Sequence, residues 1–378
     1  MPKLLTPYFL LAPVCAEALL HLHPALLPPS VQAAVGQGPF GAPPAPPAFY
    51  TASHALYVPD AAAGYRTAPH LDVLLHGHRE FSFRVRTDAR GARGPALPAP
   101  VDVAALGDSF TFGYGVNEAA TWPARLAALT GLRIANLGVN GYGPQSELAR
   151  LHSDALPLRP RVIVWQFFTN DCDDAAVFAR WQRSGHPDFY GWQQGKPDPA
   201  ARPLPNAARS LRAFLHRHSR IYELLKYALR RGDHPVSVPV GDTHHLLDLA
   251  RVQRWSDFSR AAIRAGWQAT QAALLAAQTA AAQAGVRLVV MLAPTKEETV
   301  WARLPRAAQQ SYPDLRGPAQ RMVEFCALHH LPCLDLGPAF AAAADAGAAL
   351  YFDIDLHWNA AGHTLAAQHL ADWLFKEI

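Results

Sequence analysis

The sequence is poor in lysine, in cysteine and in charge. Only five of the 34 basic residues are lysines, charged residues make up 17% of the chain, and no block of five or more Lys/Arg occurs. The net charge of +4 therefore comes from scattered arginines, and no nucleic-acid-binding patch is expected. The four cysteines form no CxxC motif, which argues against a zinc ribbon or a thioredoxin site. No repeat of 20–50 residues is present, so a solenoid or propeller is not expected.

What is present is a 378-residue chain with 50% hydrophobic residues. That composition excludes a disordered chain, a disulfide-stapled miniprotein and a many-pass membrane protein. Cys326 and Cys333 flank a predicted helix-to-strand turn. They either form a disulfide in an oxidising compartment or pack as two small buried side chains.

The N-terminal region favours export. Residues 4–27 are mostly apolar and follow Lys3, but Pro7, Pro13 and Glu17 interrupt the run. A central acidic residue disfavours a spanning helix. We therefore predict a signal or membrane anchor over 1–33, in a protein of the periplasm or cell envelope, with a buried helix as the alternative.

Residues 34–100 are predicted to be a Pro-rich linker and a short strand-containing extension. Residues 34–60 are rich in Pro, Gly and Ala, which is typical of a linker. Apolar and polar residues alternate over 71–87, which predicts one or two strands.

From residue 101 onward, strands and helices alternate. Short apolar runs predict buried parallel strands at 101–106, 133–138, 161–168, 286–293 and 332–336. Helical patterns fall between or after them at 119–130, 144–156, 262–284, 316–329 and 361–376. This order predicts an α/β domain over 101–378, with a three-layer, doubly wound, parallel five-stranded sheet.

The segment between 168 and 286 is too long for an ordinary crossover, and we predict a helical insertion at about 172–260. Residues 207–231 have the spacing of an amphipathic helix or helix pair, whereas 185–206 and 232–243 are Pro/Gly-rich and predicted as loops. Tryptophans either line a sugar groove or pack in the core; they are Trp181, Trp192, Trp255, Trp267 and Trp301.

Four motifs follow strand ends, which is where ligands bind in such sheets. The first is GDSFTFG at 107–113. Its Ser109 is placed to present a hydroxyl to the crevice and a backbone N–H to an oxyanion, or to act only as a helix cap. The chain has neither a GxSxG elbow nor a P-loop.

Two further motifs offer oxyanion donors. NLGVNGYG at 136–143 contains Gly141, whose backbone N–H is free of side-chain hindrance. FTND at 168–171 contains Asn170, whose side-chain amide is a second donor or a helix cap.

The fourth motif is DIDLHWN at 353–359. Residues two apart in an extended segment face the same side, so Asp355 is placed to orient the His357 imidazole, with Asp353 as a rival. A metal site built from Asp353, Asp355, His357 and His363 is the alternative, although no dedicated ligand spacing supports it.

The four motifs in this order resemble the SGNH (GDSL-like) hydrolase superfamily over roughly 101–378. The resemblance implies a flavodoxin-like fold and makes Ser109 the nucleophile and His357 the general base. It also implies an oxyanion hole formed by Ser109 N–H, Gly141 N–H and the Asn170 amide. The resemblance implies no metal and no cofactor.

One departure concerns the triad acid. Many family members have it three residues before the histidine, where this chain has Ile354; Asp355 stands two before. The DxHW form resembles the branch that contains the alginate O-acetylation proteins, as do Pro294-Thr295-Lys296 and the GxRG turn at 91–94. Lys296 is a candidate contact to the acyl acceptor.

We expect a serine ester hydrolase that acts on a carbohydrate or lipid ester. The alternatives are a polysaccharide O-acetyltransferase with the same Ser–His–Asp site and a non-catalytic carbohydrate-binding module. The expected partner is a small-molecule or glycan ester, with membrane association through the N-terminus; the sequence says nothing about the oligomeric state.

Overall fold

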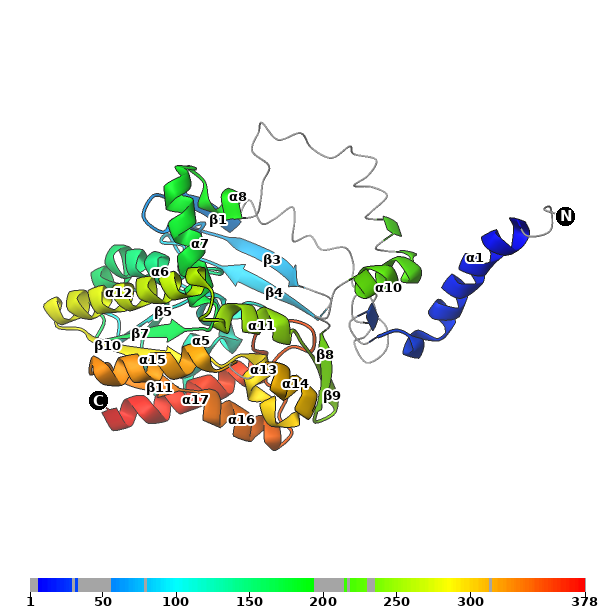
Figure 1. Cartoon of the computed structure of the whole chain (residues 1–378). Coiled ribbons are helices and arrows are strands. Elements are labelled where there is room, and N and C mark those ends of the chain that lie inside the picture. Colours follow the sequence, from blue (N-terminus) through cyan, green and yellow to red (C-terminus); the bar gives the residue numbers. More distant parts are fainter. Residues whose placement is uncertain are drawn as a thin grey trace.

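The structure is a computed structural model that describes residues 6–28, 31–32, 56–77, 80–193, 214–215, 218–229, 235–312 and 315–377. Its main body is a central sheet between two layers of helices (Figure 1). Most of the 34–60 linker and much of 185–213 lie outside the described residues.

Five parallel strands form the central sheet, as the sequence predicts. They are β5 (Val103–Leu106), β6 (Ile134–Asn136), β7 (Val162–Phe167), β10 (Arg287–Leu292) and β11 (Cys333–Asp335). The spatial order is β11-β10-β7-β5-β6. Nearly every residue of β5, β6, β7 and β10 is buried, which explains why their sequences read as continuous apolar runs.

Within the described residues, helices cover both faces of the sheet. One face packs on α6 (Pro144–Arg150), α12 (Ala261–Gln283) and α15 (Gly317–Leu328). The other packs on α5 (Trp122–Thr130), α16 (Gly337–Asp345) and α17 (Ala360–Glu377). Figure 1 shows α12 and α17 on opposite sides of the sheet. The α/β fold class with three layers is therefore confirmed.

The strand order reverses at β5. Its neighbours are β6 on one side and β7 on the other, and both follow it in the chain. The crevice at the carboxyl ends of β5 and β7 is the topological switch point, where ligands bind in open α/β sheets. The short helix α4 (Ser109–Phe112) follows β5, and α7 (Asp171–Ser184) follows β7, so both predicted motifs lie at this point.

In the part of the chain that the structure describes, three two-stranded hairpins lie outside the central sheet. They are β1 (Tyr57–Asp60) with β2 (Gly64–Thr67), β3 (Asp72–Gly77) with β4 (Phe81–Arg86), and β8 (Val236–Val240) with β9 (Thr243–Leu247). The β3–β4 pair fits the strands expected over 71–87. The prediction of loops at 232–243 is wrong, because the alternating VSVPV run and the Gly241-Asp242 turn form the third hairpin. The insertion is therefore not purely helical.

The rest of the insertion contains short helices. They are α8 (Phe189–Gln193), α10 (Arg220–Leu229) and α11 (Leu249–Ser256). Helix α8 lies within the segment 185–206 that was predicted as a loop. Further on, α13 (Lys296–Thr299) and α14 (Arg306–Ser311) follow β10. Cys326 and Cys333 are free thiols, and a hydrogen bond with Cys326 together with burial raises the pKa of Cys333.

The N-terminal helix α1 (Thr6–Leu22) pairs with α10, away from the sheet (Figure 1). Glu17 accepts hydrogen bonds from the Ser219 hydroxyl and from the N–H groups of Arg220 and Ile221, at the start of α10. The acidic residue that interrupts the apolar run thus caps another helix. Among the described residues, no helix reaches the length and apolarity that crossing a membrane requires.

A close helix crossing sets the position of α7. A Cβ at Gly266 of α12 would lie 1.7 Å from the carbonyl oxygen of Cys172 in α7. We predict that Gly266→Ala lowers the free energy of unfolding by about 2 kcal/mol, because the overlap outweighs the better helix propensity of alanine. Ala265→Ser on the exposed side of α12 should change it by less than about 0.5 kcal/mol. Equal urea-unfolding midpoints for the two variants would contradict this packing argument.

Candidate active site

Ser109 begins α4 directly after β5. The turn before it needs Gly107, which has a φ of +152° and leaves no room for a side chain. A Cβ there would lie 2.3 Å from Thr111 Oγ1 and 2.5 Å from Gln166 Oε1. Asp108 caps α4 by accepting a hydrogen bond from Phe110 N–H at 2.8 Å. The capping role therefore belongs to Asp108, which leaves the Ser109 hydroxyl available for other contacts.

A continuous hydrogen-bonded chain joins Ser109, His357 and Asp355. Ser109 Oγ lies 2.7 Å from His357 Nε2, and His357 Nδ1 lies 2.6 Å from Asp355 Oδ1. With Nδ1 donating to the carboxylate, Nε2 is left to accept the hydroxyl proton. The serine and the histidine are 248 residues apart in the sequence and meet at the switch point. This geometry is that of a base-activated nucleophile.

The alternative acid, Asp353, does not contact His357. Its carboxylate lies 3.5 Å from His245 Nδ1. Asp355, by contrast, accepts from both the backbone N–H and the Nδ1–H of His357. The ligands of the alternative metal site do not converge either, because buried His363 accepts a hydrogen bond from Trp122 N–H. Within the described ranges, no group of three His, Cys, Asp or Glu side chains could hold a metal ion.

Gly141 lies in a loop that is hydrogen-bonded to the β1–β2 hairpin. Its φ is +73°, a conformation that favours glycine. On the residue before it, the Asn140 carbonyl accepts from Tyr65 Oη at 2.7 Å, and Asn140 Nδ2 donates to Tyr57 Oη at 2.9 Å. Both tyrosines belong to the β1–β2 hairpin. The loop that carries this predicted oxyanion donor is thus fixed from outside the central sheet.

Asn170 immediately precedes α7, at the end of β7. Its Nδ2 donates to Asp174 Oδ2 at 2.8 Å, one helical turn further on. A primary amide has two N–H hydrogens, so this bond fixes the plane of the amide and leaves one hydrogen for a developing oxyanion. The structure thus gives Asn170 an orienting partner that the sequence analysis did not identify.

A group of carboxyls lies near these loops, in which Asp108, Glu147 and Asp171 are buried and Asp174 is half-buried. Burial raises the pKa of Asp108 to about 6, although the Phe110 N–H and the nearby His357 oppose the shift. Burial, reinforced by neighbouring carboxyls, raises the pKa values of Glu147, Asp171 and Asp174 well above the usual range. These groups therefore hold protons at neutral pH more readily than exposed acids do.

Lys296, the candidate contact to the acyl acceptor, is buried in the structure. Its side chain is 1% exposed, and its Nζ donates to the carbonyls of Phe352 and Asp353 at 2.9 and 3.1 Å. Burial lowers the pKa of Lys296 to about 8, against the opposing effect of nearby carboxylates. Lys296 thus contacts, from the interior of the protein, the backbone of the loop that carries Asp355 and His357.

Two other residues near the site make contacts that the sequence analysis did not predict, although it names the GxRG turn that contains Arg93. Buried Arg93 donates to the carbonyls of Phe112, Gly113 and Val116, at the end of α4 and just beyond it. Glu80 accepts from the N–H groups of Ile354 and Asp355. Glu80 and Ile354 are 274 residues apart in the sequence, and neither Arg93 nor Glu80 lies in an expected strand-end motif. No signal in a single sequence could have indicated the Glu80 contact.

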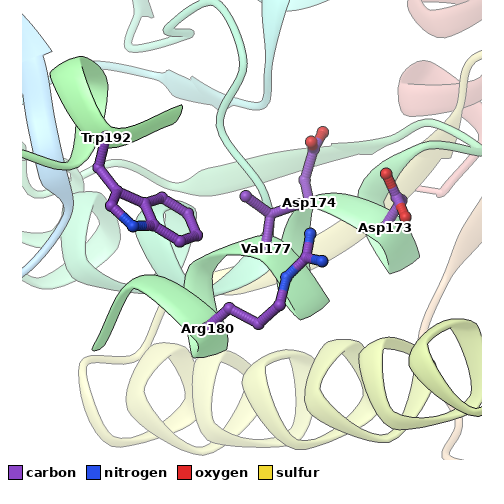
Figure 2. Close-up of a pocket in the computed structure, with 5 residues that line it drawn as sticks. All are labelled: Asp173, Asp174, Val177, Arg180 and Trp192. Carbon is purple, nitrogen blue, oxygen red and sulfur yellow. The ribbon is translucent and has the colours of Figure 1, made fainter. Parts of the chain in front are cut away.

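A pocket of about 410 Å³ lies beside Asn170. It is lined by Asp173, Asp174, Val177 and Arg180 of α7 and by Trp192 of α8. Figure 2 shows Trp192 and Arg180 extending toward Val177 and Asp174 from the two helices. Asp174 thus belongs both to this pocket and to the hydrogen bond that orients Asn170. Of the five candidate tryptophans, Trp192 lines the pocket and Trp181 is buried in an aromatic cluster.

Comparison with known proteins gives one family and a set of structural neighbours. The profile of the GDSL-like lipase/acylhydrolase family matches residues 105–365. A search of curated protein sequences finds no match. A catalytic mutant of an acetylxylan esterase from Geobacillus stearothermophilus is similar at 12% identity and a TM-score of 0.37, over 74% of this chain and 95% of that chain. A GDSL-like lipase from Bacteroides thetaiotaomicron is similar at 13% identity and a TM-score of 0.37, over 75% and 93%.

The assignment of the acid is tested by a matched pair of variants. We predict that Asp355→Asn slows the labelling of Ser109 by a fluorophosphonate by on the order of 100-fold or more, because the imidazole loses its carboxylate partner. Asp353→Asn should label within about threefold of the unmodified protein. Labelling rates are followed by intact-protein mass spectrometry, and peptide mapping locates the adduct. A larger loss in Asp353→Asn than in Asp355→Asn would contradict the assignment.

Proposed function

Because the chain belongs to the GDSL-like lipase/acylhydrolase family, we propose that it is a serine ester hydrolase that works through an acyl-enzyme. The observation that carries this proposal is the hydrogen-bonded chain from Ser109 through His357 to Asp355. Such a chain activates a hydroxyl that is otherwise a weak nucleophile at neutral pH.

In the proposed reaction, Ser109 Oγ attacks the ester carbonyl while His357 Nε2 takes its proton. Asp355 stabilises the imidazolium that forms. The oxyanion is held by the N–H groups of Ser109 and Gly141 and by the Asn170 amide, each worth about 3 kcal/mol in the transition state. His357 then protonates the leaving alcohol, and a water molecule, deprotonated by the same imidazole, releases the acid from Ser109.

We further propose that the alcohol part of the ester is a carbohydrate. The pocket beside Asn170 supports this, because its lining contains two carboxyls and a guanidinium, which can hydrogen-bond hydroxyl groups. The Trp192 ring offers an apolar face on which a sugar ring can pack. A lipid alcohol would gain little from such a lining, since specific sites for apolar groups are lined mostly by apolar side chains.

The same acyl-enzyme can pass its acyl group to a sugar hydroxyl, which would make the protein a polysaccharide O-acetyltransferase. The polar pocket favours keeping this second candidate, because it offers an acceptor sugar a place beside the oxyanion donors. Product analysis distinguishes the two: free acetate indicates hydrolysis, whereas acetylated oligosaccharide, formed from an activated acetyl ester and an unmodified oligosaccharide, indicates transfer.

The location in the cell envelope and the likeness to the alginate-related branch stay predictions. Leu19 and Leu22 of α1 are exposed, which supports association of this helix with an apolar surface. A glycan ester of the envelope would then lie within reach of the site.

Hydrolysis of acetylated oligosaccharides and of p-nitrophenyl acetate tests the proposal. We expect both activities in the unmodified protein and the loss of both in Ser109→Ala. Trp192→Ala and Arg180→Ala should raise KM for the oligosaccharide about fivefold, because each removes one contact worth about 1 kcal/mol, and should leave p-nitrophenyl acetate hydrolysis nearly unchanged. Arg183→Ala, on the exposed end of the same helix, is the matched control.

Two outcomes would contradict the proposal. Equal hydrolysis by Ser109→Ala and the unmodified protein would exclude the acyl-enzyme. Faster hydrolysis of long-chain than of acetyl p-nitrophenyl esters, with no activity on acetylated sugars, would exclude the carbohydrate substrate but keep the serine mechanism.

A further inference from the structure

The loop between Tyr351 and Trp358 carries both Asp355 and His357. A β-bridge between Tyr351 and Trp358 closes it, and Phe352 N–H donates to the His357 carbonyl at 3.1 Å. The backbone groups within the loop have no sheet ladder to join. Their partners therefore decide whether the two catalytic side chains keep their relative position.

The N–H groups of this loop are bound by Glu80. One carboxylate oxygen accepts from Ile354 N–H and the other from Asp355 N–H, both at 2.7 Å. Glu80 lies between β3 and β4, and next to it the Phe81 ring packs on Phe352 with centroids 4.3 Å apart. The hairpin thus grips the loop through two charge-assisted hydrogen bonds and an aromatic contact.

The carbonyl groups of the loop accept hydrogen bonds from a cationic side chain and from a backbone N–H. Lys296 Nζ donates to the Phe352 and Asp353 carbonyls, and Leu246 N–H of β9 donates to the Asp353 carbonyl at 2.7 Å. An anion thus holds the loop's donors and a cation holds its acceptors. Their charges also interact through space with each other and with Asp355.

We propose that Glu80 and Lys296 form a clamp that positions Asp355 and His357, so that the β3–β4 hairpin is a functional part of the catalytic site. Neither side chain contacts the serine, and both act through the backbone of residues 352–355. The inference rests on the proposed function, because it assigns positioning residues to that same reaction.

The clamp predicts opposite electrostatic effects of its two charges. When ionised, Glu80 favours the protonated imidazole of His357, whereas the Lys296 cation disfavours it. Burial raises the pKa of Glu80, and the two loop N–H groups and Lys296 oppose that shift. His357 also faces Asp355, Asp108, Tyr114 and His363, which stay unchanged in these variants. Removing one charge of the clamp should therefore move the acidic limb of the kcat/KM profile in a direction set by its sign.

The kinetic test uses Glu80→Gln and Lys296→Met with p-nitrophenyl acetate. We expect each to lower kcat about 10- to 100-fold with KM changed less than about threefold, because misplaced catalytic groups affect the chemical step. The acidic limb of kcat/KM should move to lower pH in Glu80→Gln and to higher pH in Lys296→Met. The double variant should have its limb near that of the unmodified protein and a loss of kcat smaller than the product of the single losses.

A matched control separates positioning from loss of the hairpin. Asp72→Asn removes an exposed ion pair with Arg84 at the opposite end of the same hairpin from Glu80, and should keep kcat and the pH profile. Thermal unfolding of each variant reports whether the fold persists. Should Lys296→Met fail to fold, Glu80→Gln and Glu80→Ala still test the clamp, with the greater kcat loss expected for alanine, which retains no acceptor.

A readout without turnover keeps the clamp testable if the protein hydrolyses no ester. The His357 Nδ1 proton, held at a 2.6 Å separation from Asp355 Oδ1, should give a downfield proton NMR resonance that persists in Ser109→Ala. Adding Glu80→Gln or Lys296→Met to that background should shift or abolish it, whereas Asp72→Asn should not. An unchanged resonance in both variants, or movement of the acidic limb in the same direction in both, would overturn the clamp.

Discussion

The catalytic geometry depends on one constraint, which is that the loop from Tyr351 to Trp358 must keep a single backbone conformation. The sheet positions Ser109 and Asn170 directly at strand ends, but His357 and Asp355 lie on a loop that no strand continues. The backbone N–H and C=O groups of such a loop have no partners in a sheet, so its conformation depends on hydrogen bonds from elsewhere in the protein. Here the holding groups are charged, and Lys296 is almost completely buried. A buried charge is costly unless it is paired and hydrogen-bonded, and here two loop carbonyls accept hydrogen bonds from Lys296 while the charges of Glu297 and Glu80 act on it through space.

The N-terminal extension contacts each of the loops that the sheet alone leaves free. Tyr65 binds the Gly141 loop, Arg93 binds the end of the Ser109 helix, and Glu80 binds the Asp355 loop. The three contacts come from consecutive segments between residues 57 and 94. Residues expected to be a linker with a few strands therefore include the structure that braces the active site, and a catalytic domain cut at residue 101 would lose all three contacts.

The parts that could be predicted from sequence are those set by local pattern. Buried parallel strands are short apolar runs, so all five were found, and the motifs that follow β5, β6 and β7 gave Ser109, Gly141 and Asn170. Period-two spacing also brought Asp355 to His357. The β8–β9 hairpin was missed because its Pro239 and Gly241 read as loop residues, although an edge strand tolerates proline. The contacts of Glu80 and Arg93 could not be found, although the GxRG turn that contains Arg93 was recognised, because their partners are backbone groups, which leave no pattern in side-chain identity.

The four carboxyls near the Ser109 and Asn170 loops and the Glu80–Lys296 clamp have different electrostatic consequences. If Asp108, Glu147, Asp171 and Asp174 were all ionised, their combined charge would oppose an oxyanion at Ser109 and Asn170. Burial raises the pKa of each of them, so each takes up a proton more readily than an exposed acid, and each proton taken up reduces that repulsion. Asp355, by contrast, lies where Lys296 contributes a positive charge and where His357 donates two hydrogen bonds to it. The fold thus offers a positive charge and two hydrogen-bond donors to the carboxyl beside His357, and it raises the pKa values of the four carboxyls near the Ser109 and Asn170 loops.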